Sequence, residues 1–496
     1  MNFFRRLSRL PTPWFTIGMV SIFLFSAMLR FWQLGRFNTL VFDEVYYAKF
    51  ANNYLTQTEF FNAHPPLSQY IIAISIWIGS HLPFGQEIVN NETGSTLAPW
   101  TYRWVNALTG SFIPVVVGAI AYQLTKRRSY GFVAALLIAL DGLFLVESRY
   151  ALNNIYLVIF GLLGQLCLIL ALQHRQLNQK LWLGLAGVSF GASAGIKWNG
   201  LAFLLAVYLL WIFAWIIKAF APKRRKYEST SPLENLTRLN LIQFLLNLLI
   251  IPIITYSLLW IPHIILNPKY GFLEMQKQIF SYHQRIGSGP DTHPYCAEWF
   301  TWPLTIRPVV YFYKNTGLSE KLESSLPPLP PGIDYKANPL IFDVHAMGNP
   351  IVWWLSALAI LSLVLILINY IWDWEKRRQA RHNKIQIKQK VKFPPASEMW
   401  LLLYLLLNWL ANFLPWAKVT RCTFVYHYMG AAVFAILALA WWIERWLNSQ
   451  QSRLRVMGIT AIFLILIAFV FWMPVYLGLP LSPQNWQLRM WFRSWI

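Results

Sequence analysis

The chain has 496 residues, of which 56% are hydrophobic and 17% aromatic, while only 12% carry a charge. A soluble globular protein usually has about twice that charged fraction, so the composition excludes an ordinary soluble domain. The 42 lysines and arginines outnumber the 20 aspartates and glutamates, which gives a net charge of +22. These basic residues stand in short blocks between apolar runs, a pattern that argues against a nucleic-acid-binding protein.

Apolar runs of about 20 residues, the length that crosses a bilayer, recur along the whole chain. They predict an all-α polytopic membrane protein with about eleven transmembrane helices. The expected spans are 13–33, 101–124, 130–148, 154–173, 181–197, 199–217, 240–265, 350–372, 399–416, 422–443 and 455–478. The first run is longer than a signal-peptide core and no small-residue cleavage site follows it, so we expect a retained first helix.

The basic blocks predict how the chain is oriented. They lie in the N-terminal arm and at 126–128, 174–180, 218–238, 373–398 and 444–454. Lysine and arginine favour the inner side of a membrane. We therefore expect a multi-pass protein of the cell inner (plasma) membrane, with its N-terminus inside and its C-terminus outside.

Two long outer segments divide the chain into three expected regions. An N-terminal transmembrane region, 1–265, contains the first outer segment, 34–100. The second outer segment, 266–349, is rich in proline, tryptophan and tyrosine. Residues 350–496 then form a C-terminal transmembrane region of four-helix type. The apolar stretch 68–82 is too short for a span and predicts a helix that lies along the membrane surface.

Asp43 and Glu44 stand side by side about ten residues after the first span. Adjacent carboxylates repel each other unless a cation or a reaction uses them. One interpretation is an acidic turn in water, and the other is a general base or ion ligand at the outer membrane edge. A carboxylate can remove the proton of a hydroxyl that attacks a carbon atom, provided that it lies within hydrogen-bond distance.

Several cations are expected at the same outer edge. Arg103, Arg149 and Lys197 fall at the outer ends of predicted spans, and Arg421 precedes another. Contact with lipid headgroups would explain each of them individually. Together with the carboxylates they favour a site for an anionic group, most naturally a phosphate, which arginine binds through two parallel hydrogen bonds.

The histidines and cysteines do not form a metal-binding pattern. His64 precedes two prolines, His293 precedes one and His427 lies between two tyrosines, and none has a partner at the spacing of a zinc site. Three cysteines, an odd number, do not make a disulfide framework. Cys296 and Cys422 both fall on the expected outer side, so whether they form a single bridge is left open. No P-loop or glycine-rich dinucleotide fingerprint is present in the sequence.

Seven short motifs occur in the order known from one family of enzymes. They are Phe42-Asp43-Glu44, His64-Pro65-Pro66-Leu67, Tyr102-Arg103, Glu147-Ser148-Arg149-Tyr150, Gly195-Ile196-Lys197-Trp198-Asn199-Gly200, His293-Pro294-Tyr295 with Trp299 and Trp302-Pro303-Leu304, and Phe424-Val425-Tyr426-His427-Tyr428. In this order they closely resemble the protein O-mannosyltransferase family, which belongs to the GT-C superfamily of membrane glycosyltransferases. The resemblance extends over nearly the whole chain.

The resemblance implies a GT-C fold and the transfer of mannose from a polyprenyl-phosphate mannose donor to serine and threonine hydroxyls of exported proteins. It implies inversion at the sugar carbon and an active site that faces outside. Asp43 resembles the base that takes the proton of the acceptor hydroxyl, and Glu44 would help to hold the acceptor or the sugar. The other residues expected at the donor phosphate and substrates are Arg103, Arg149, Lys197, His64, Asn199, His293, Trp299, Arg421 and His427.

No cofactor beyond the lipid-linked donor and no metal ligand is implied, and a need for a divalent metal is left open. The expected partners are the polyprenyl-phosphate sugar, membrane lipid and exported acceptor proteins, with the secretion machinery as a further candidate. Eukaryotic members carry a β-trefoil MIR domain in the second outer segment. Because motifs occupy much of 266–349, we expect a bacterial type without that domain.

Two other departures leave the sugar and the acceptor open. Ser68 and Gln69 follow the His-Pro-Pro-Leu motif where glycine and lysine are usual, and Asn153 and Asn154 replace an acidic residue that often follows Arg149. One alternative is a GT-C transferase that moves a sugar or aminosugar to a lipid or polysaccharide. A transporter or flippase is less favoured, because it would line a pathway through the middle of the membrane with polar residues.

Overall fold

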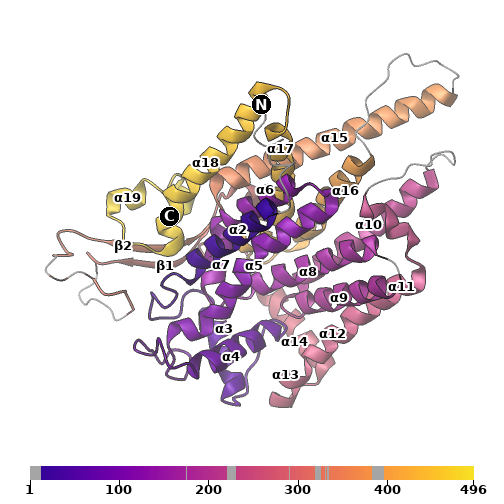
Figure 1. The fold of residues 1–496 in the computed structure, drawn as a ribbon. Helices are drawn as coiled ribbons and strands as arrows, with labels where there is room; N and C mark the ends of the chain where they lie inside the picture. Colours follow the sequence, from indigo (N-terminus) through magenta and orange to yellow (C-terminus); the bar gives the residue numbers. More distant parts are fainter. Residues whose placement is uncertain are drawn as a thin grey trace.

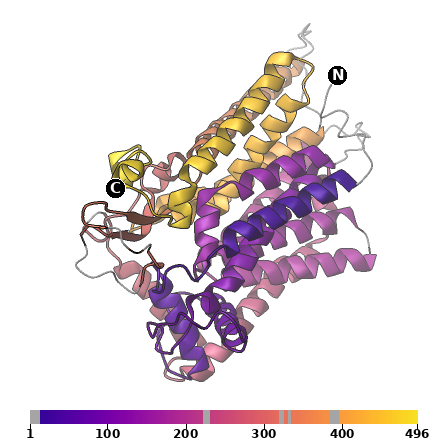
Figure 2. The same ribbon diagram turned by 60° about the vertical axis from the view of Figure 1, so that its left-hand side comes forward.

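The computed structural model describes residues 13–174, 176–220, 231–289, 291–318, 325–329, 331, 334–382 and 396–496. The basic residues predicted in the N-terminal arm, at 221–230 and at 383–395 lie outside these ranges. Long helices packed side by side make up most of the described chain (Figure 1). The short helices α3 and α4 and the strand pair lie at one end of this bundle, which we call the site end (Figure 2).

In the N-terminal region, long helices of the bundle are connected by shorter helices and loops, several of which lie at the site end. Its helices are α2 (Pro13–Phe31), α3 (Glu44–Leu55), α4 (Leu67–Ser80), α5 (Pro99–Thr125), α6 (Arg128–Ala139), α7 (Gly142–Arg149), α8 (Asn154–Gln173), α9 (Gln176–Ala194), the short η1 (Trp198–Gly200) and α10 (Leu201–Phe220). After η2 (Pro232–Arg238), a nearly continuous helix is formed by α11 (Leu241–Leu245), the π-helical η3 (Leu246–Ile250), α12 (Ile251–Leu259) and α13 (Ile261–Leu266).

The C-terminal region is built from four long helices. These are α15 (Pro350–His382), α16 (Ala396–Phe413), α17 (Met429–Leu447) and α18 (Ser452–Leu477). The short segments η5 (Leu414–Lys418) and η6 (Val425–Tyr428) join α16 to α17, and α19 (Pro483–Gln487) and η7 (Arg493–Trp495) follow α18. Most residues of the segment 425–447, which contains α17, are buried, so this segment forms the centre of this half.

Nine helices in the described part of the chain are long and apolar enough to cross a membrane, or up to ten if one bent pair counts as a span. The protein is therefore a multi-span membrane protein, while the expected number of eleven stays a prediction. The helix α9 occupies the fifth expected span but is not among the nine, because its glycines, serines and polar first turn lower its hydropathy. Gly187 lets this helix pack closely, since a Cβ there would lie 2.1 Å from the carbonyl oxygen of Asn247.

The third expected span, 130–148, is broken rather than continuous. Its two halves, α6 and α7, meet at a bend of 60°. Asp141 lies at the break, and its side chain accepts a hydrogen bond from the backbone N–H of Phe144, 3.1 Å away. An aspartate at this position caps a new helix start and ends the preceding one. The bend turns α7 so that Glu147 and Arg149 reach the site end.

The second outer segment contains a helix and a two-stranded sheet in its described residues. The elements are α14 (Phe272–Arg285), η4 (Trp299–Leu304), β1 (Val309–Asn315) and β2 (Ile341–Ala346). The strands β1 and β2 pair antiparallel, and their register shifts between Val310 and Phe312. In the first outer segment, α4 confirms the expected short apolar helix, although its position relative to a membrane is not established.

Candidate active site

Asp43 is the residue before the first turn of α3, and its carboxylate is unused by the fold. An aspartate in this N-cap position normally accepts a hydrogen bond from the helix backbone, but the Asp43 side chain makes no such bond. Among the described residues, no hydrogen bond or ion pair to this carboxylate is formed. The group is half-buried and therefore available to another molecule.

Glu44, the next residue, is fully used. Its two carboxylate oxygens accept hydrogen bonds from Nε and Nη2 of Arg103 at 2.9 and 2.8 Å, and both side chains are completely buried. The backbone N–H groups of Val41 and Ala151 donate to the same carboxylate at 2.8 and 2.7 Å. Glu44 therefore joins the loop before α3 to α5 and to the connection between α7 and α8.

Arg103 has a structural set of partners, which differs from the expected contact with a donor phosphate. Besides Glu44, its guanidinium donates to the carbonyl oxygens of Leu34, Phe37 and Thr39 at 3.2, 3.0 and 2.7 Å. Three backbone carbonyls and one carboxylate surround the group, which has 0% exposure. The structure thus places Arg103 behind Asp43 as a support for the loop 34–44.

Arg149 is held by the fold through one nitrogen of its guanidinium group. Its Nη1 donates to the carbonyl oxygens of Leu29, Arg30 and Trp32 at 2.7, 3.1 and 2.8 Å. These carbonyls belong to the C-terminal end of α2, where a cation satisfies groups that lack a partner within the helix. Arg149 therefore holds the end of α2 against α7 through Nη1. Its buried Nε has no hydrogen-bond partner among the described residues, so its contact with the donor phosphate stays a prediction.

Lys197 belongs to a chain of buried polar groups beside Asp43. Its Nζ donates to Oδ1 of Asn154 at 2.9 Å, and Nδ2 of Asn154 lies 3.2 Å from both carboxylate oxygens of Glu147. The hydroxyl of Tyr311 donates to Glu147 from the opposite direction. The Lys197 ammonium also lies 5.4 Å from the centre of the Tyr426 ring, which gives it a favourable cation–π contact.

The electrostatic environment makes Asp43 a stronger base than an aspartate in water. Burial raises the pKa of Asp43 to about 6, and the positive charge of Lys197 opposes this rise. A carboxylate with a pKa near 6 is largely ionised at neutral pH and still accepts a proton readily. The arrangement suits a general base.

A second group of nitrogen-containing side chains faces Lys197. His64 and His283 lie with their rings 5.2 Å apart, and Nε2 of His283 donates to the carbonyl oxygen of Ala63 at 2.9 Å. Burial and the nearby charges of Lys197 and Arg421 lower the pKa of His64 well below its usual range. Mutual repulsion of this kind marks a place where an anion would be stabilised.

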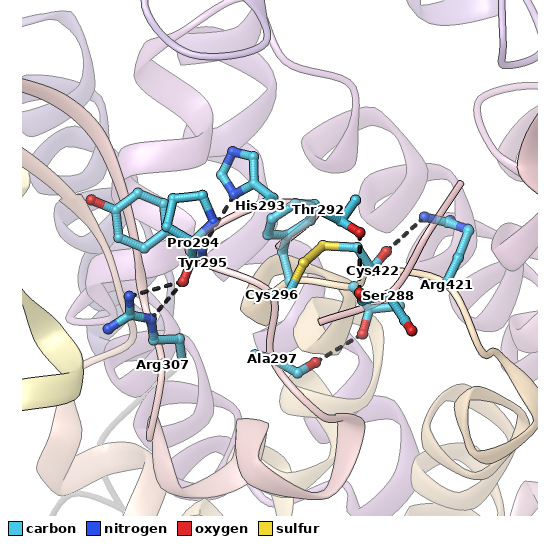
Figure 3. The surroundings of a disulfide bond; sticks show 12 residues. Ser288, Thr292, His293, Pro294, Tyr295, Cys296, Ala297, Arg307, Arg421 and Cys422 are labelled. Atoms are coloured by element: carbon cyan, nitrogen blue, oxygen red, sulfur yellow. Dashed lines mark hydrogen bonds between the residues drawn. A yellow bond between two sulfur atoms is a disulfide. The ribbon is translucent and has the colours of Figure 1, made fainter. Parts of the chain in front are cut away.

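A disulfide bond holds Arg421 beside this group (Figure 3). The sequence left open whether Cys296 and Cys422 form a bridge. In the structure they are bonded, with their Cα atoms 5.2 Å apart. The backbone N–H of Cys422 donates to the carbonyl oxygen of Gly287 at 2.7 Å, and Nη1 of Arg421 donates to the carbonyl oxygen of Cys422 at 3.1 Å. The segment after α14 is thereby fastened to the segment before η6.

The other expected residues are distributed around this centre. His427 lies in η6, where Nδ1 of its ring accepts from the backbone N–H of Phe424 at 3.1 Å, and Asn199 lies in η1 two residues after Lys197. His293 lies three residues before Cys296, in the segment that we call the disulfide loop, and its Nδ1 accepts a hydrogen bond from the N–H of Tyr295 at 3.2 Å (Figure 3). The ring of Trp299 packs against Phe413 at 4.9 Å. The interactions found for His293 and Trp299 thus support the surrounding loop.

Three side chains of the centre were given no role from the sequence. Glu147 appeared only within a motif, Asn154 only as a departure from the family, and Tyr311 not at all. Glu147 could have been found, because an acidic residue within an apolar run is costly unless it has a purpose. Tyr311 carried no such signal, since tyrosines are common in the second outer segment. Across the described ranges, no group of three or more His, Cys, Asp or Glu side chains is arranged to hold a metal ion.

Two family profiles match consecutive parts of the chain. The profile described as dolichyl-phosphate-mannose-protein mannosyltransferase matches residues 20–266, and the C-terminal four-transmembrane region of protein O-mannosyltransferase matches residues 268–495. Together they cover both the free carboxylate of Asp43 and the disulfide loop.

Similar proteins come from bacteria and from eukaryotes. A polyprenol-phosphate-mannose–protein mannosyltransferase of Mycolicibacterium smegmatis is 24% identical over 95% of this chain and 91% of its own length. Its counterpart in Corynebacterium glutamicum is 22% identical over 87% of this chain and 81% of its own. The structure of the S. cerevisiae protein O-mannosyltransferase Pmt1-Pmt2 complex bound to the sugar donor superimposes with a TM-score of 0.78, at 14% identity and 98% and 93% coverage.

Proposed function

The chain belongs to the dolichyl-phosphate-mannose-protein mannosyltransferase family and is a glycosyltransferase of GT-C fold, and we propose that Asp43 is the general base of its reaction. In this proposal the enzyme transfers mannose from a polyprenyl-phosphate mannose to a serine or threonine hydroxyl of an exported protein. The observation that carries the assignment is the contrast between Asp43, which has no partner among the described residues, and Glu44, which is saturated.

The proposed reaction is a single displacement at the anomeric carbon of mannose. The acceptor oxygen forms a bond to this carbon while its proton passes to the Asp43 carboxylate. The bond from the anomeric carbon to the phosphate oxygen breaks, and its electron pair stays on the polyprenyl phosphate. Because the acceptor attacks from the face opposite to the leaving phosphate, the configuration at the sugar carbon is inverted.

Lys197 and Arg421 are the proposed contacts of the leaving phosphate. Both belong to the electrostatic group around His64 and His283. The leaving phosphate gains charge in the transition state, and fixed cations in a partly buried site stabilise such charge more than water does. Arg103 supports the loop 34–44 from behind, since backbone carbonyls and Glu44 occupy its guanidinium group. Arg149 holds the end of α2 through its Nη1.

The proposed site faces the outer side of the plasma membrane. Asp43, Lys197 and Arg421 lie at the site end, opposite to the basic connection Lys126–Arg128, where Arg127 pairs with Glu444 at 3.2 Å. Basic connections favour the inner side. This placement would let the polyprenyl tail stay in lipid while an exported protein approaches from outside, in contact with the secretion machinery where acceptors emerge unfolded.

The function is tested with purified protein in lipid vesicles, labelled polyprenyl-phosphate mannose and a peptide rich in serine and threonine. We expect label in the peptide that alkaline β-elimination releases, and we expect the Asp43→Asn variant to transfer none. Label in lipid or polysaccharide instead of the peptide would favour the alternative acceptor. Equal transfer by parent and Asp43→Asn would remove Asp43 from the role of base.

A further inference from the structure

Phe42, the residue immediately before Asp43, has a backbone conformation that its side chain does not favour. Its φ angle is +53°, in the left-handed region that is unfavourable for a residue with a Cβ. Such a conformation persists only where the surrounding contacts hold it. The direction in which the chain presents Asp43 therefore depends on what holds Phe42.

The ring of Tyr311, on β1 of the second outer segment, lies flat against the ring of Phe42. The ring centres are 4.1 Å apart and the planes differ by 8°. Tyr426 packs against the edge of Phe42 from another side, at 6.1 Å and 69°. Stacked aromatic pairs contribute stability beyond the area that they bury, and this contribution can offset the cost of the left-handed backbone.

A bulge in β1 turns Tyr311 towards Phe42. Val310 pairs with His345 and Phe312 pairs with Val344, which are consecutive residues of β2. Tyr311, between Val310 and Phe312, therefore has no partner residue on β2. Bulges redirect side chains in this way, and they break the alternation of a strand. As a result the consecutive residues Tyr311 and Phe312 are both buried, and Phe312 packs against Phe37 with ring centres 4.3 Å apart.

We propose that Tyr311 is a positioning residue, which holds Phe42 in its left-handed conformation by stacking and thereby fixes the Asp43 carboxylate for the reaction. The proposal rests on the proposed function, because it uses Asp43 as the base. In this proposal the bulged strand β1 supplies the contact that holds Phe42, which the loop before α3 does not supply itself. A misplacement of about 1 Å in such a group can lower a rate by about 100-fold.

The test compares Tyr311→Leu, Tyr311→Phe and the control Tyr313→Leu in the transfer assay. Tyr313 lies on the same strand but is 42% exposed, so its replacement should leave the rate unchanged. Tyr311→Phe keeps the stacked ring and loses only the hydroxyl on Glu147, and its kcat should stay within about threefold of the parent. Tyr311→Leu should lower kcat about 10- to 100-fold, with the donor KM changed less than about threefold.

A second substitution separates positioning from folding. Glycine adopts positive φ at no steric cost, so Phe42→Gly combined with Tyr311→Leu should have a higher kcat than Tyr311→Leu alone. A rescue of this kind is not expected if Tyr311→Leu merely destabilises the protein, because Phe42→Gly removes a further packed ring.

The outcomes that overturn the proposal differ from those that overturn the function. A parent enzyme that transfers mannose while Tyr311→Leu is equally active, or gains nothing from Phe42→Gly, would contradict the positioning role. If Tyr311→Phe lowered kcat as much as Tyr311→Leu, the hydroxyl group that bonds to Glu147 would be responsible. That result would contradict the role of the stacked ring. A parent that transfers no mannose at all would instead contradict the proposed function.

Discussion

Arg103 and Glu44 form a two-point ion pair, with Nε to Oε1 at 2.9 Å and Nη2 to Oε2 at 2.8 Å, in which neither side chain is exposed. The residues are 59 positions apart in the sequence. The pair fixes the start of α3 to α5, so the two adjacent carboxylates of the chain have different tasks. Glu44 holds the loop in place, while Asp43 is left without a partner in the described chain and faces the substrates in our proposal.

The ion pair predicts a large effect of Glu44→Gln on stability. Removing one charge from a buried pair leaves the other unpaired, which typically costs about 3–5 kcal/mol. We expect a loss of this order in the free energy of unfolding, measured by thermal denaturation in detergent. The control is Glu274→Gln, which breaks an exposed contact with Lys277 at 4.0 Å and should change stability by less than about 1 kcal/mol. A Glu44→Gln protein as stable as this control would contradict the structural role.

Asp43→Asn should have the opposite effect on stability, although we expect it to abolish transfer. The pKa of Asp43 is raised in the folded protein to about 6, so its contribution to stability is complete below the unfolded value near 4 and is lost as the pH rises through about 6. At pH 7 the parent carries the cost of a partly desolvated carboxylate, and the asparagine does not. Thermal denaturation at pH 7 should show a variant at least as stable as the parent, and a clear destabilisation would argue for a structural role of Asp43.

The transfer rate should depend on pH through the same group. Asp43 must be ionised to accept a proton, so kcat/KM should rise as the pH increases through about 6 and then level off. The titratable groups that face Asp43 are Lys197, Glu147, Tyr47, Tyr311 and Tyr426. The profile is measured with saturating peptide and several donor concentrations. A rate that stays constant between pH 5 and pH 8, a window of about one to two units on each side of the raised pKa, would argue against this base.

Lys197→Met should weaken the use of the donor. Its ammonium is held by Asn154 at 2.9 Å and is proposed to stabilise the leaving phosphate, and the loss of one such donor typically lowers a rate about 100- to 1,000-fold. We expect a fall of this order in kcat/KM for the lipid-linked sugar. Lys269→Met, which removes an exposed cation after α13, is the matched control and should remain active. Equal activity of the two variants would exclude Lys197 from phosphate stabilisation.

The disulfide should be needed to keep Arg421 in place. Cys422→Ser and Cys296→Ser should each raise the donor KM, because the segment that carries Arg421 loses its covalent link to the segment after α14. Dithiothreitol should act similarly on the parent, reducing the bond to two thiols while it is itself oxidised to a cyclic disulfide. Cys167→Ser, at a buried free cysteine, is the control. Mass spectrometry of peptides under non-reducing conditions would contradict the bridge if 296 and 422 were found as free thiols.

Much of the architecture could be predicted from the sequence, because a bilayer-spanning helix is a local property. The expected spans 154–173 and 350–372 agree with α8 and the apolar part of α15 to within about two residues. The break between α6 and α7 was not predicted, since it depends on Asp141 accepting from Phe144, Asn349 and Trp353 together. A hydropathy pattern contains no information about such a distant set of donors.

The site was predicted in part. The sequence singled out Asp43, Lys197 and Arg421, because charged residues at the ends of apolar runs need a reason to be there. It also grouped Arg103 and Arg149 with the phosphate, and the structure gives partners within the fold to all three nitrogens of the Arg103 guanidinium but only to Nη1 of Arg149. Which cations are satisfied internally and which face a ligand depends on backbone carbonyls brought together from distant segments.

The sequence by itself determined the class of the protein, the positions of most helices and the motifs of the family, since these depend on composition, on periodicity and on the order of short segments. Only the tertiary structure decided that Glu44 is bound while Asp43 has no partner among the described residues, that Cys296 meets Cys422, and that Tyr311 stacks on Phe42. In each of the contacts Glu44–Arg103, Cys296–Cys422 and Tyr311–Phe42, the two residues lie far apart along the chain. Their geometry therefore exists only once the helices have packed.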